Sequence, residues 1–228
     1  MAIVLSTVTF DALHTSAREK HEEVGGRDGR RIEISGVIAG EQTVAGVEAK
    51  LDAILQAASA EEYSAALSLR SGRRLWVRRV QFSRDVSPST RVGSFVLVVE
   101  AKSPFEESID AQTIEWAITT QEAELALTTE GNACALPILT VVASGTVANP
   151  SFSDGTRSIL FSGAVQDGET LVLDCGEGRA TLEGQDVTAY TSGLFPRISP
   201  PGTTLSWADS PDSSHHADVT ISLRDRWW

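Results

Sequence analysis

Cysteine is scarce in this chain. Its 228 residues include two cysteines, Cys134 and Cys175, which lie far apart and form no CxxC pair. A disulfide framework or a zinc finger needs several suitably spaced ligands, and the adjacent pair His215 and His216 does not supply them, because neighbours on a strand point to opposite faces. The sequence therefore predicts two reduced thiols and no metal site.

Long hydrophobic runs are also missing. The apolar run Phe95–Val99 is far shorter than the roughly 20 residues that a membrane-spanning helix needs. The first ten residues, MAIVLSTVTF, contain no basic segment and no small-residue cleavage site after a long apolar stretch. We expect neither membrane insertion nor a signal peptide.

The usual catalytic motifs are absent from the sequence. It contains neither GxSxG nor HExxH, and its four histidines lie in polar stretches. Adjacent carboxylates such as Glu61 and Glu62 also lie in polar stretches, where a solvated surface is the simpler interpretation. The sequence predicts a protein that is not an enzyme and that uses no cofactor.

A glycine-rich stretch, GETLVLDCGEGRATLEGQD at residues 168–186, raises the alternative of a phosphate-binding loop. Such a loop lies between a strand and a helix, because the amides at the helix start face the anion. Here strand-like residues both precede and follow Gly176-Glu177-Gly178, and no lysine is near. The glycines instead predict a tight hairpin turn, with further turns at Asp167-Gly168 and Glu183-Gly184.

Basic residues are scarce in the second half of the chain. The formal net charge is −12, and residues 1–104 carry 14 basic and 13 acidic residues, whereas residues 105–228 carry 5 and 18. This asymmetry predicts two domains, with a boundary in KSPFEES at residues 102–108, where a proline interrupts strand pairing. We place the domains at residues 1–106 and 107–228 and expect the acidic second domain to repel DNA.

The first half of the sequence predicts strands, one helix and one hairpin. Alternating residues 3–10 and 31–39 predict strands, whereas the charged residues 14–30 predict a long exposed loop or an extended arm. Apolar residues recur at helical spacing over 43–58, with Thr43 as the cap. Residues 64–70 and 73–83 predict a hairpin that turns at Ser71-Gly72, and residues 91–101 predict a strand covered on both faces.

The second half shows no helical periodicity. Short strand-like runs alternate with turn residues, a pattern typical of a β-sandwich. The predicted strands are residues 112–119, 122–129, 136–143, 157–162, 169–175, 178–183, 203–208 and 217–224. The chain ends on Trp227 and Trp228, which would point to opposite faces of a last strand, so we expect one in the core and one against another surface.

Two residue clusters are candidate sites. Arginines interleave with a tryptophan over residues 70–79, which suits single-stranded nucleic acid or a protein interface, and we favour the interface. Its members are Arg70, Arg73, Arg74, Trp76, Arg78 and Arg79. A carbohydrate site, the alternative, needs an exposed aromatic platform beside polar groups. The candidate set for it is Trp207, Asp209, His215 and His216.

The order of motifs in residues 130–228 resembles the galectin-like domain of distal tail proteins of long-tailed bacteriophages. The resembling segments are GNACALPILTVVASGTVANPSFS, ILFSGAVQDGETLVLDCGEGRATLEGQD, LFPRISPPGTTLSW and VTISLRDRWW. The first half, with a strand ending ISGVI, one helix, a hairpin and a strand closing in SPF, looks like the tail-tube-like ring domain of the same family.

This resemblance implies a mainly β fold, with an N-terminal tail-tube-like β-barrel or sandwich carrying one α-helix and a C-terminal galectin-like β-sandwich. It also implies a structural protein of the virion tail tip, assembled in the bacterial cytoplasm. Six copies would form a ring around the DNA channel, between the tail tube protein and the tail-tip hub or baseplate proteins, with the tape measure protein as a further partner. The alternatives are a carbohydrate-binding module and a ring component of a contractile tail or related injection machine.

Overall fold

The chain forms two compact units, Met1–Ile109 (unit 1) and Asp110–Trp228 (unit 2). The computed structural model describes residues 2–10, 14–24, 27–101 and 103–228, and of residues 23, 24, 27 and 28 it describes the backbone. The described chain is mostly β-strand with a single α-helix, so the predicted mainly β fold is confirmed. None of its described helices is long and apolar enough to cross a membrane.

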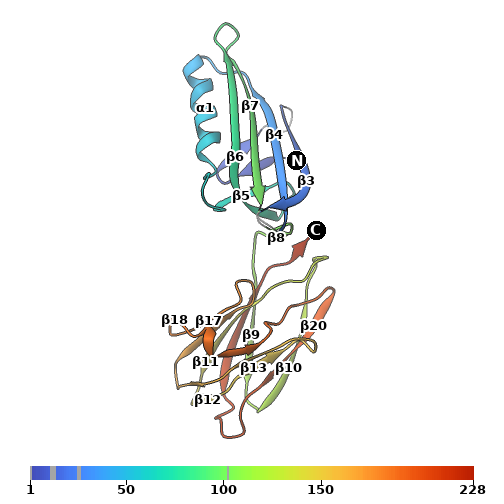
Figure 1. The fold of residues 1–228 in the computed structure, drawn as a ribbon, viewed down its shortest axis with the longest axis vertical. Helices are drawn as coiled ribbons and strands as arrows, with labels where there is room; N and C mark the ends of the chain where they lie inside the picture. Colours follow the sequence, from blue (N-terminus) through green and yellow to red (C-terminus); the bar gives the residue numbers. More distant parts are fainter. Residues whose placement is uncertain (1, 11–13, 25–26, 102) are drawn as a thin grey trace. The chain divides into compact units, whose positions relative to one another are not determined.

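Unit 1 is built on one antiparallel sheet with the strand order β2-β1-β5-β6-β7-β4-β3 (Figure 1). A short strand, β8, pairs with the start of β6, and it contains the position after residue 106 where the sequence placed the domain boundary. The strands are β1 Ile3–Leu5, β2 Val8–Phe10, β3 Thr15–Val24, β4 Arg27–Ile38, β5 Ala65–Ser68, β6 Arg73–Ser87, β7 Val92–Ala101 and β8 Glu106–Ser108.

The helix α1 spans Val44–Gln56 and covers one face of this sheet over β6 and β7 (Figure 1). Thr43 caps it as predicted, because its Oγ1 accepts a hydrogen bond of 3.0 Å from the Gly46 N–H. The helical spacing places Val47, Leu51 and Ile54 on the buried side. Burial of each such side chain contributes roughly 1.5–3 kcal/mol, which fixes the helix on the sheet.

The charged stretch 14–30 is not an exposed loop. Its described residues 15–24 and 27–30 form β3 and the beginning of β4, which pair from Thr15 with Gly36 to Val24 with Arg27. The prediction was wrong because it assumed that a strand shows one apolar face in its sequence. β3 is the outermost strand of the sheet, and such a strand needs to bury few side chains. The strand is held by its backbone pairing and by ion pairs, such as that between Arg31 and Glu22 at 3.0 Å.

The predicted hairpin of β5 and β6 is present, with Gly72 at φ 74° in its turn. The next strand, β7, differs from the prediction that both of its faces are covered. Phe95, Leu97 and Val99 are buried beneath α1, whereas Val96 and Val98 on the other face are half-buried. The face of the sheet opposite α1 therefore remains partly open within unit 1.

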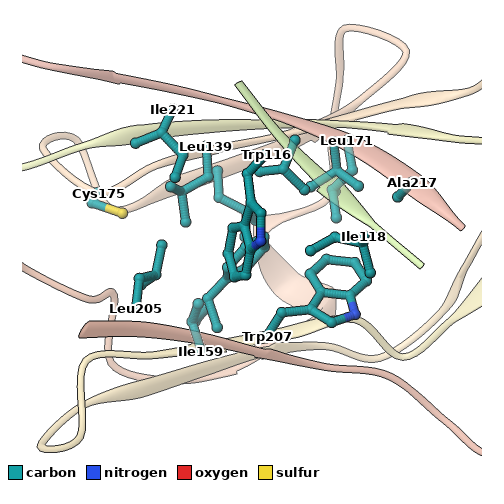
Figure 2. Packing of buried hydrophobic residues seen from close by; sticks show 14 of the residues in the cluster. Trp116, Ile118, Leu139, Ile159, Leu171, Cys175, Leu205, Trp207, Ala217 and Ile221 are labelled. Carbon is teal, nitrogen blue, oxygen red and sulfur yellow. The ribbon is translucent and has the colours of Figure 1, made fainter. Parts of the chain in front are cut away.

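Unit 2 packs two antiparallel sheets against each other. One has the order β10-β20-β13-β14-β19 and the other β18-β17-β16-β11-β21-β9. Residues from both sheets meet between them, and Figure 2 shows Leu205 and Trp207 on one side and Leu139 and Ile221 on the other. The strands are β9 Gln112–Ile118, β10 Glu122–Thr128, β11 Ile138–Ala143, β12 Val147–Ala148, β13 Ser151–Ser153, β14 Ser158–Phe161, β15 Ala164–Val165, β16 Thr170–Asp174, β17 Arg179–Leu182, β18 Gln185–Asp186, β19 Thr191–Gly193, β20 Gly202–Ala208, β21 Ala217–Leu223 and β22 Arg226–Trp227, with a 3-10 helix η1 at Thr188–Tyr190.

The glycine-rich stretch 168–186 is a hairpin, as predicted. β16 and β17 pair across a turn in which Gly178 has φ 64°, and Oδ1 of Asp174 accepts hydrogen bonds from the N–H groups of Gly176 and Glu177, both at 2.9 Å. A carboxylate already occupies the amides that a phosphate would need. Glu183 and Gly184 also have positive φ, consistent with the predicted second turn.

The chain end and the cysteines complete unit 2. Trp228 is 57 % exposed and Trp227 is half-buried, so the expectation that one of them lies in the core is wrong. The end is held by its backbone, because the Trp228 N–H donates to Oδ1 of Asn132 at 2.9 Å. Cys134 and Cys175 are free cysteines, and burial raises the pKa of Cys175 to about 12.

Candidate assembly surfaces

Four of the five arginines predicted as a subunit interface contact acids of their own unit. The largest group joins β3, β4, the β5–β6 turn and β8. Nη1 of Arg30 lies 3.0 Å from Glu19 and 3.8 Å from Glu106, and Arg70 contacts the same two acids at 3.0 and 2.5 Å. Arg73 lies 3.7 Å from Glu106. Arg30 and Glu106 are each 1 % exposed, so the centre of this network is buried in unit 1, whereas Arg70 and Arg73 lie at its partly exposed rim.

A second network centres on the buried Glu100 of β7. Oε1 of Glu100 accepts hydrogen bonds from Arg78 at 2.6 Å and from the Tyr63 hydroxyl at 3.0 Å. Burial and the hydrogen bond to Glu100 raise the pKa of Tyr63. Because Glu100 lies beneath Arg78, it balances the positive charge of this arginine. Less of the charge that was predicted to contact a partner subunit is therefore left unbalanced.

The remaining members of the predicted interface are partly exposed. The Arg74 guanidinium lies 4.6 Å from the centre of the Trp76 ring, and both side chains donate to Oε1 of Glu107 at 2.9 Å. Trp76 is 42 % exposed. Arg79 donates to the backbone carbonyl of Leu55 at the end of α1. In the structure these residues make contacts within unit 1, and their role between subunits stays a prediction.

The two long edges of the unit 1 sheet form a surface that the sequence did not indicate. β3 pairs with β4 and with no further strand among the described residues. β6 pairs with β7 on one side, but on its other side β5 and β8 reach residues 73–77 and leave residues 80–87 unpaired within the described chain. A β-bulge between Arg79 and Gln81 marks the start of this open stretch, and Val80 is exposed there.

The backbone groups that point outward from these edges follow from the ladder. In an antiparallel pair, residues that bond to the partner strand alternate with residues whose N–H and C=O point away. The Val37 N–H donates to the His14 carbonyl at 2.9 Å, so the backbone groups of His14 point toward β4. By alternation, the backbone groups of Thr15, Ala17 and Glu19 point outward, away from β4. The same alternation, carried through β4 and β7 by their register, directs Phe82, Arg84 and Val86 outward from β6.

The carbohydrate alternative is contradicted by the position of its aromatic residue. Trp207 is 1 % exposed and packs edge-on against Phe152, with ring centres 5.1 Å apart, between the two sheets of unit 2 (Figure 2). It presents no face to a sugar ring. Asp209 and His215 do come together, with Oδ1 and Nδ1 2.8 Å apart, but the Asp209 carboxylate is buried in this pair. His216 has no part in that contact.

The described residues contain no cluster of side chains that suits a metal site. No group of three or more His, Cys, Asp or Glu side chains gathers there as a metal site. The high pKa of Cys175 keeps its thiol protonated and unreactive at neutral pH. What the described surface does offer is unpaired backbone at sheet edges, where strands of other chains can pair.

These features define a class of protein: a two-unit β protein with a one-helix sheet unit and a β-sandwich. Residues 130–227 match the family model of the siphovirus-type tail component, C-terminal domain. A search of the curated proteins finds no match.

The particular likeness is to Dit. Over 100 % of this chain and 99 % of the other, the structure matches the crystal structure of the SPP1 Dit (gp 19.1) protein, with a TM-score of 0.67 and 12 % sequence identity. That protein is described as a paradigm of the hub adsorption apparatus in phages that infect Gram-positive bacteria. The chain is thus Dit-like, in residues 130–227 by sequence and over its whole length by fold.

Proposed function

We propose that this protein is a structural component of a phage tail, in which six copies form a ring that joins the tail tube to the tail tip around the DNA channel. The family match of residues 130–227 and the Dit-like fold support the tail assignment. The proposed partners are the tail tube protein, the tail-tip hub or baseplate proteins and the tape measure protein. The proposed location is the virion tail tip, after assembly in the host cytoplasm, and the protein has no catalytic role.

The observation that carries the ring is the pair of open edges on one sheet. β6, β7, β4 and β3 alternate in direction, so β3 runs opposite to β6. When β3 of one copy meets residues 80–87 of β6 in the next, the alternation continues through the joint. A head-to-tail contact of this kind uses two different surfaces of each copy and closes into a ring when the rotation per copy divides a full turn.

The same placement gives each face of the sheet a role. α1 covers one face, and the partly open face carries Val96 and Val98 together with charges of both signs, such as Lys20, Arg31 and Glu33. A channel wall of mixed charge has no strong net attraction for phosphate, so DNA passes without being held. We propose that this face lines the channel.

Proline substitution at the edge tests the ring. Ala17→Pro removes an outward N–H from β3 without removing a hydrogen bond to β4. We expect wild-type chain at high concentration to reach six times the 24.4 kDa chain mass in light scattering after size exclusion, and Ala17→Pro to stay monomeric. Ala17→Val keeps the N–H and serves as the matched control.

A second variant addresses the other edge. Arg84→Pro removes an outward N–H from β6, and Arg84→Thr is its control, because both variants lose the exposed ion pair with Asp52. Circular dichroism and the melting temperature establish that each variant is folded. Rings formed by folded Ala17→Pro and Arg84→Pro alike would overturn this joint, and a wild type that stays monomeric at every concentration would overturn the ring.

A further inference from the structure

One edge of unit 2 is open in a different way. β19, at Thr191–Gly193, is the last strand of its sheet and pairs with β14 alone among the described residues. The Ser162 N–H donates to the Tyr190 carbonyl and the Leu194 N–H donates to the Ser158 carbonyl, both at 2.8 Å. Residues 190, 192 and 194 therefore face β14, and the residues between them point their backbone groups outward.

The outward groups form a short template for a further strand. The Thr191 N–H is used by the Thr188 carbonyl, which leaves the Thr191 carbonyl and both backbone groups of Gly193 on the open side. Gly193 has φ 102°, and a side chain there would overlap the Ser158 carbonyl oxygen, so the position requires glycine.

Exposed apolar side chains flank this template. Tyr190 and Leu194 are each 61 % exposed, and no charged residue occurs from Val187 to Pro196. Natural sheet edges are commonly protected by charges, prolines or bulges, and an apolar edge without charge is a place where another chain adds a strand. Next to this edge, Phe195 packs against the core of unit 2.

The backbone near β19 is already held in place. Oδ2 of Asp154 accepts a hydrogen bond of 2.8 Å from the Arg197 N–H, and its Oδ1 accepts from the N–H groups of Thr156 and Arg157 at 2.8 and 2.7 Å. An incoming strand would therefore meet a segment that needs little ordering, which lowers the entropic cost of binding.

The charge of unit 2 indicates which kind of segment would bind at the β19 edge. Residues 154–197 carry three arginines against seven carboxylates, and residues 110–228 carry five arginines against sixteen carboxylates. Arg179 is moreover paired with Asp186 at 3.2 Å. Unit 2 as a whole therefore carries a strongly negative net charge, which attracts basic segments and repels acidic ones.

We propose that the β19 edge, with Tyr190 and Leu194, is a docking site for another protein, which adds an extended segment carrying basic residues and at least one apolar anchor. The added strand bonds to the Thr191 carbonyl and to Gly193. Its apolar side chain covers Tyr190 or Leu194, and its basic residues complement the negative net charge of unit 2. This site lies on unit 2 and is independent of the ring joint proposed for unit 1.

A displayed library of random linear peptides, selected on the full-length protein, tests the site. We expect the selected peptides to alternate apolar and polar residues, to carry net positive charge, and to bind Leu194→Asp at least about tenfold more weakly than wild type. Ile138→Asp, which places the same charge at an exposed apolar position on the other sheet, is the matched control and should bind like wild type.

Two further arms make the result decisive. Replacing the basic residues of a selected peptide by glutamate should abolish its binding, and Tyr190→Ala should weaken it, which keeps the test valid if Leu194→Asp fails to fold. The proposal is wrong if no peptide is selected, if the selected peptides are acidic, or if folded Leu194→Asp and Tyr190→Ala both bind like wild type. Each of these outcomes leaves the ring proposal standing.

Discussion

The two units differ in the side chains that they bury and in where their apolar cores lie. Unit 1 buries the charged side chains of Arg30, Glu100 and Glu106, and its apolar core lies on one face of a sheet. Unit 2 buries the carboxylates of Asp209 and Asp225, and its apolar core lies between two sheets. A sandwich covers the inner faces of both its sheets by itself. In a single sheet with one helix the helix covers one face, and the other face and the long edges remain open within the unit. The comparison teaches that unit 2 covers the inner faces of its sheets by itself, whereas unit 1 leaves a face and two edges open, and the proposed ring rests on those edges.

The largest effect should come from the core of unit 2. Trp207→Ala removes a fully buried aromatic side chain, and we expect it to lower the free energy of unfolding of unit 2 by about 3–5 kcal/mol. Differential scanning calorimetry should show a loss confined to one transition, with ring formation unchanged in the folded protein. Tyr190→Ala is the exposed control and should change that transition little. A Trp207→Ala protein that unfolds like wild type would show that the sandwich core is misplaced.

The ion network of unit 1 provides the corresponding test. Arg30→Ala leaves Glu106 buried with less compensation, and removal of one partner from a buried ion pair costs about 3–5 kcal/mol. We expect the loss in the transition of unit 1, measured by the same calorimetry. Arg84→Ala, which breaks the exposed ion pair with Asp52, should cost less than about 1 kcal/mol. Equal losses for the two variants would contradict the burial of the network.

Asp154 gives a smaller effect that depends on pH. Burial would raise the pKa of Asp154, but the N–H donors of Arg197, Arg157 and Thr156 bring it below its ordinary value of 3.8. A carboxylate with a lowered pKa stabilises the folded state above its unfolded pKa, and this contribution is lost as the pH falls through the folded pKa. Asp154→Asn removes the acceptor for Arg197 and should cost about 1–2 kcal/mol at pH 7.

Urea unfolding of unit 2 at several pH values measures this effect. The difference between wild type and Asp154→Asn should shrink once the pH falls below about 4, because the wild-type carboxyl is then becoming protonated as well. A matched control is Asp218→Asn, whose side chain is exposed on β21 and which should change the stability little at any of these pH values. A difference that stays constant from pH 7 to pH 3 would mean that the hydrogen bonds to Asp154 do not depend on its charge.

The sequence predicted those elements whose pattern is local. The cap at Thr43 with the apolar stripe through Leu51, and the glycines of the β16–β17 hairpin, specify their structures over a few residues. The inward position of Trp207 could also have been found, because Leu205 and Trp207 alternate with Ser206 and Ala208 along β20. A strand with that alternation places its tryptophan in the core.

Other features depend on partners distant in sequence. Arg30 and Glu106 are 76 positions apart, and nothing near either residue signals that they share a buried site. The edge strand β3 has no apolar face to reveal it, and strands of two or three residues such as β19 are too short to show a period. The open edges depend on the order of the strands in the sheet, and a single sequence does not reveal that order.

The central claim is that the ring closes through the edges of unit 1. A cryo-electron microscopy reconstruction of the assembled full-length chain tests it most directly. We expect β3 of each copy to lie antiparallel beside residues 80–87 of β6 in the next copy, in one continuous ladder around the channel. A ring held together by contacts between the second units, with both of these edges facing solvent, would contradict the account.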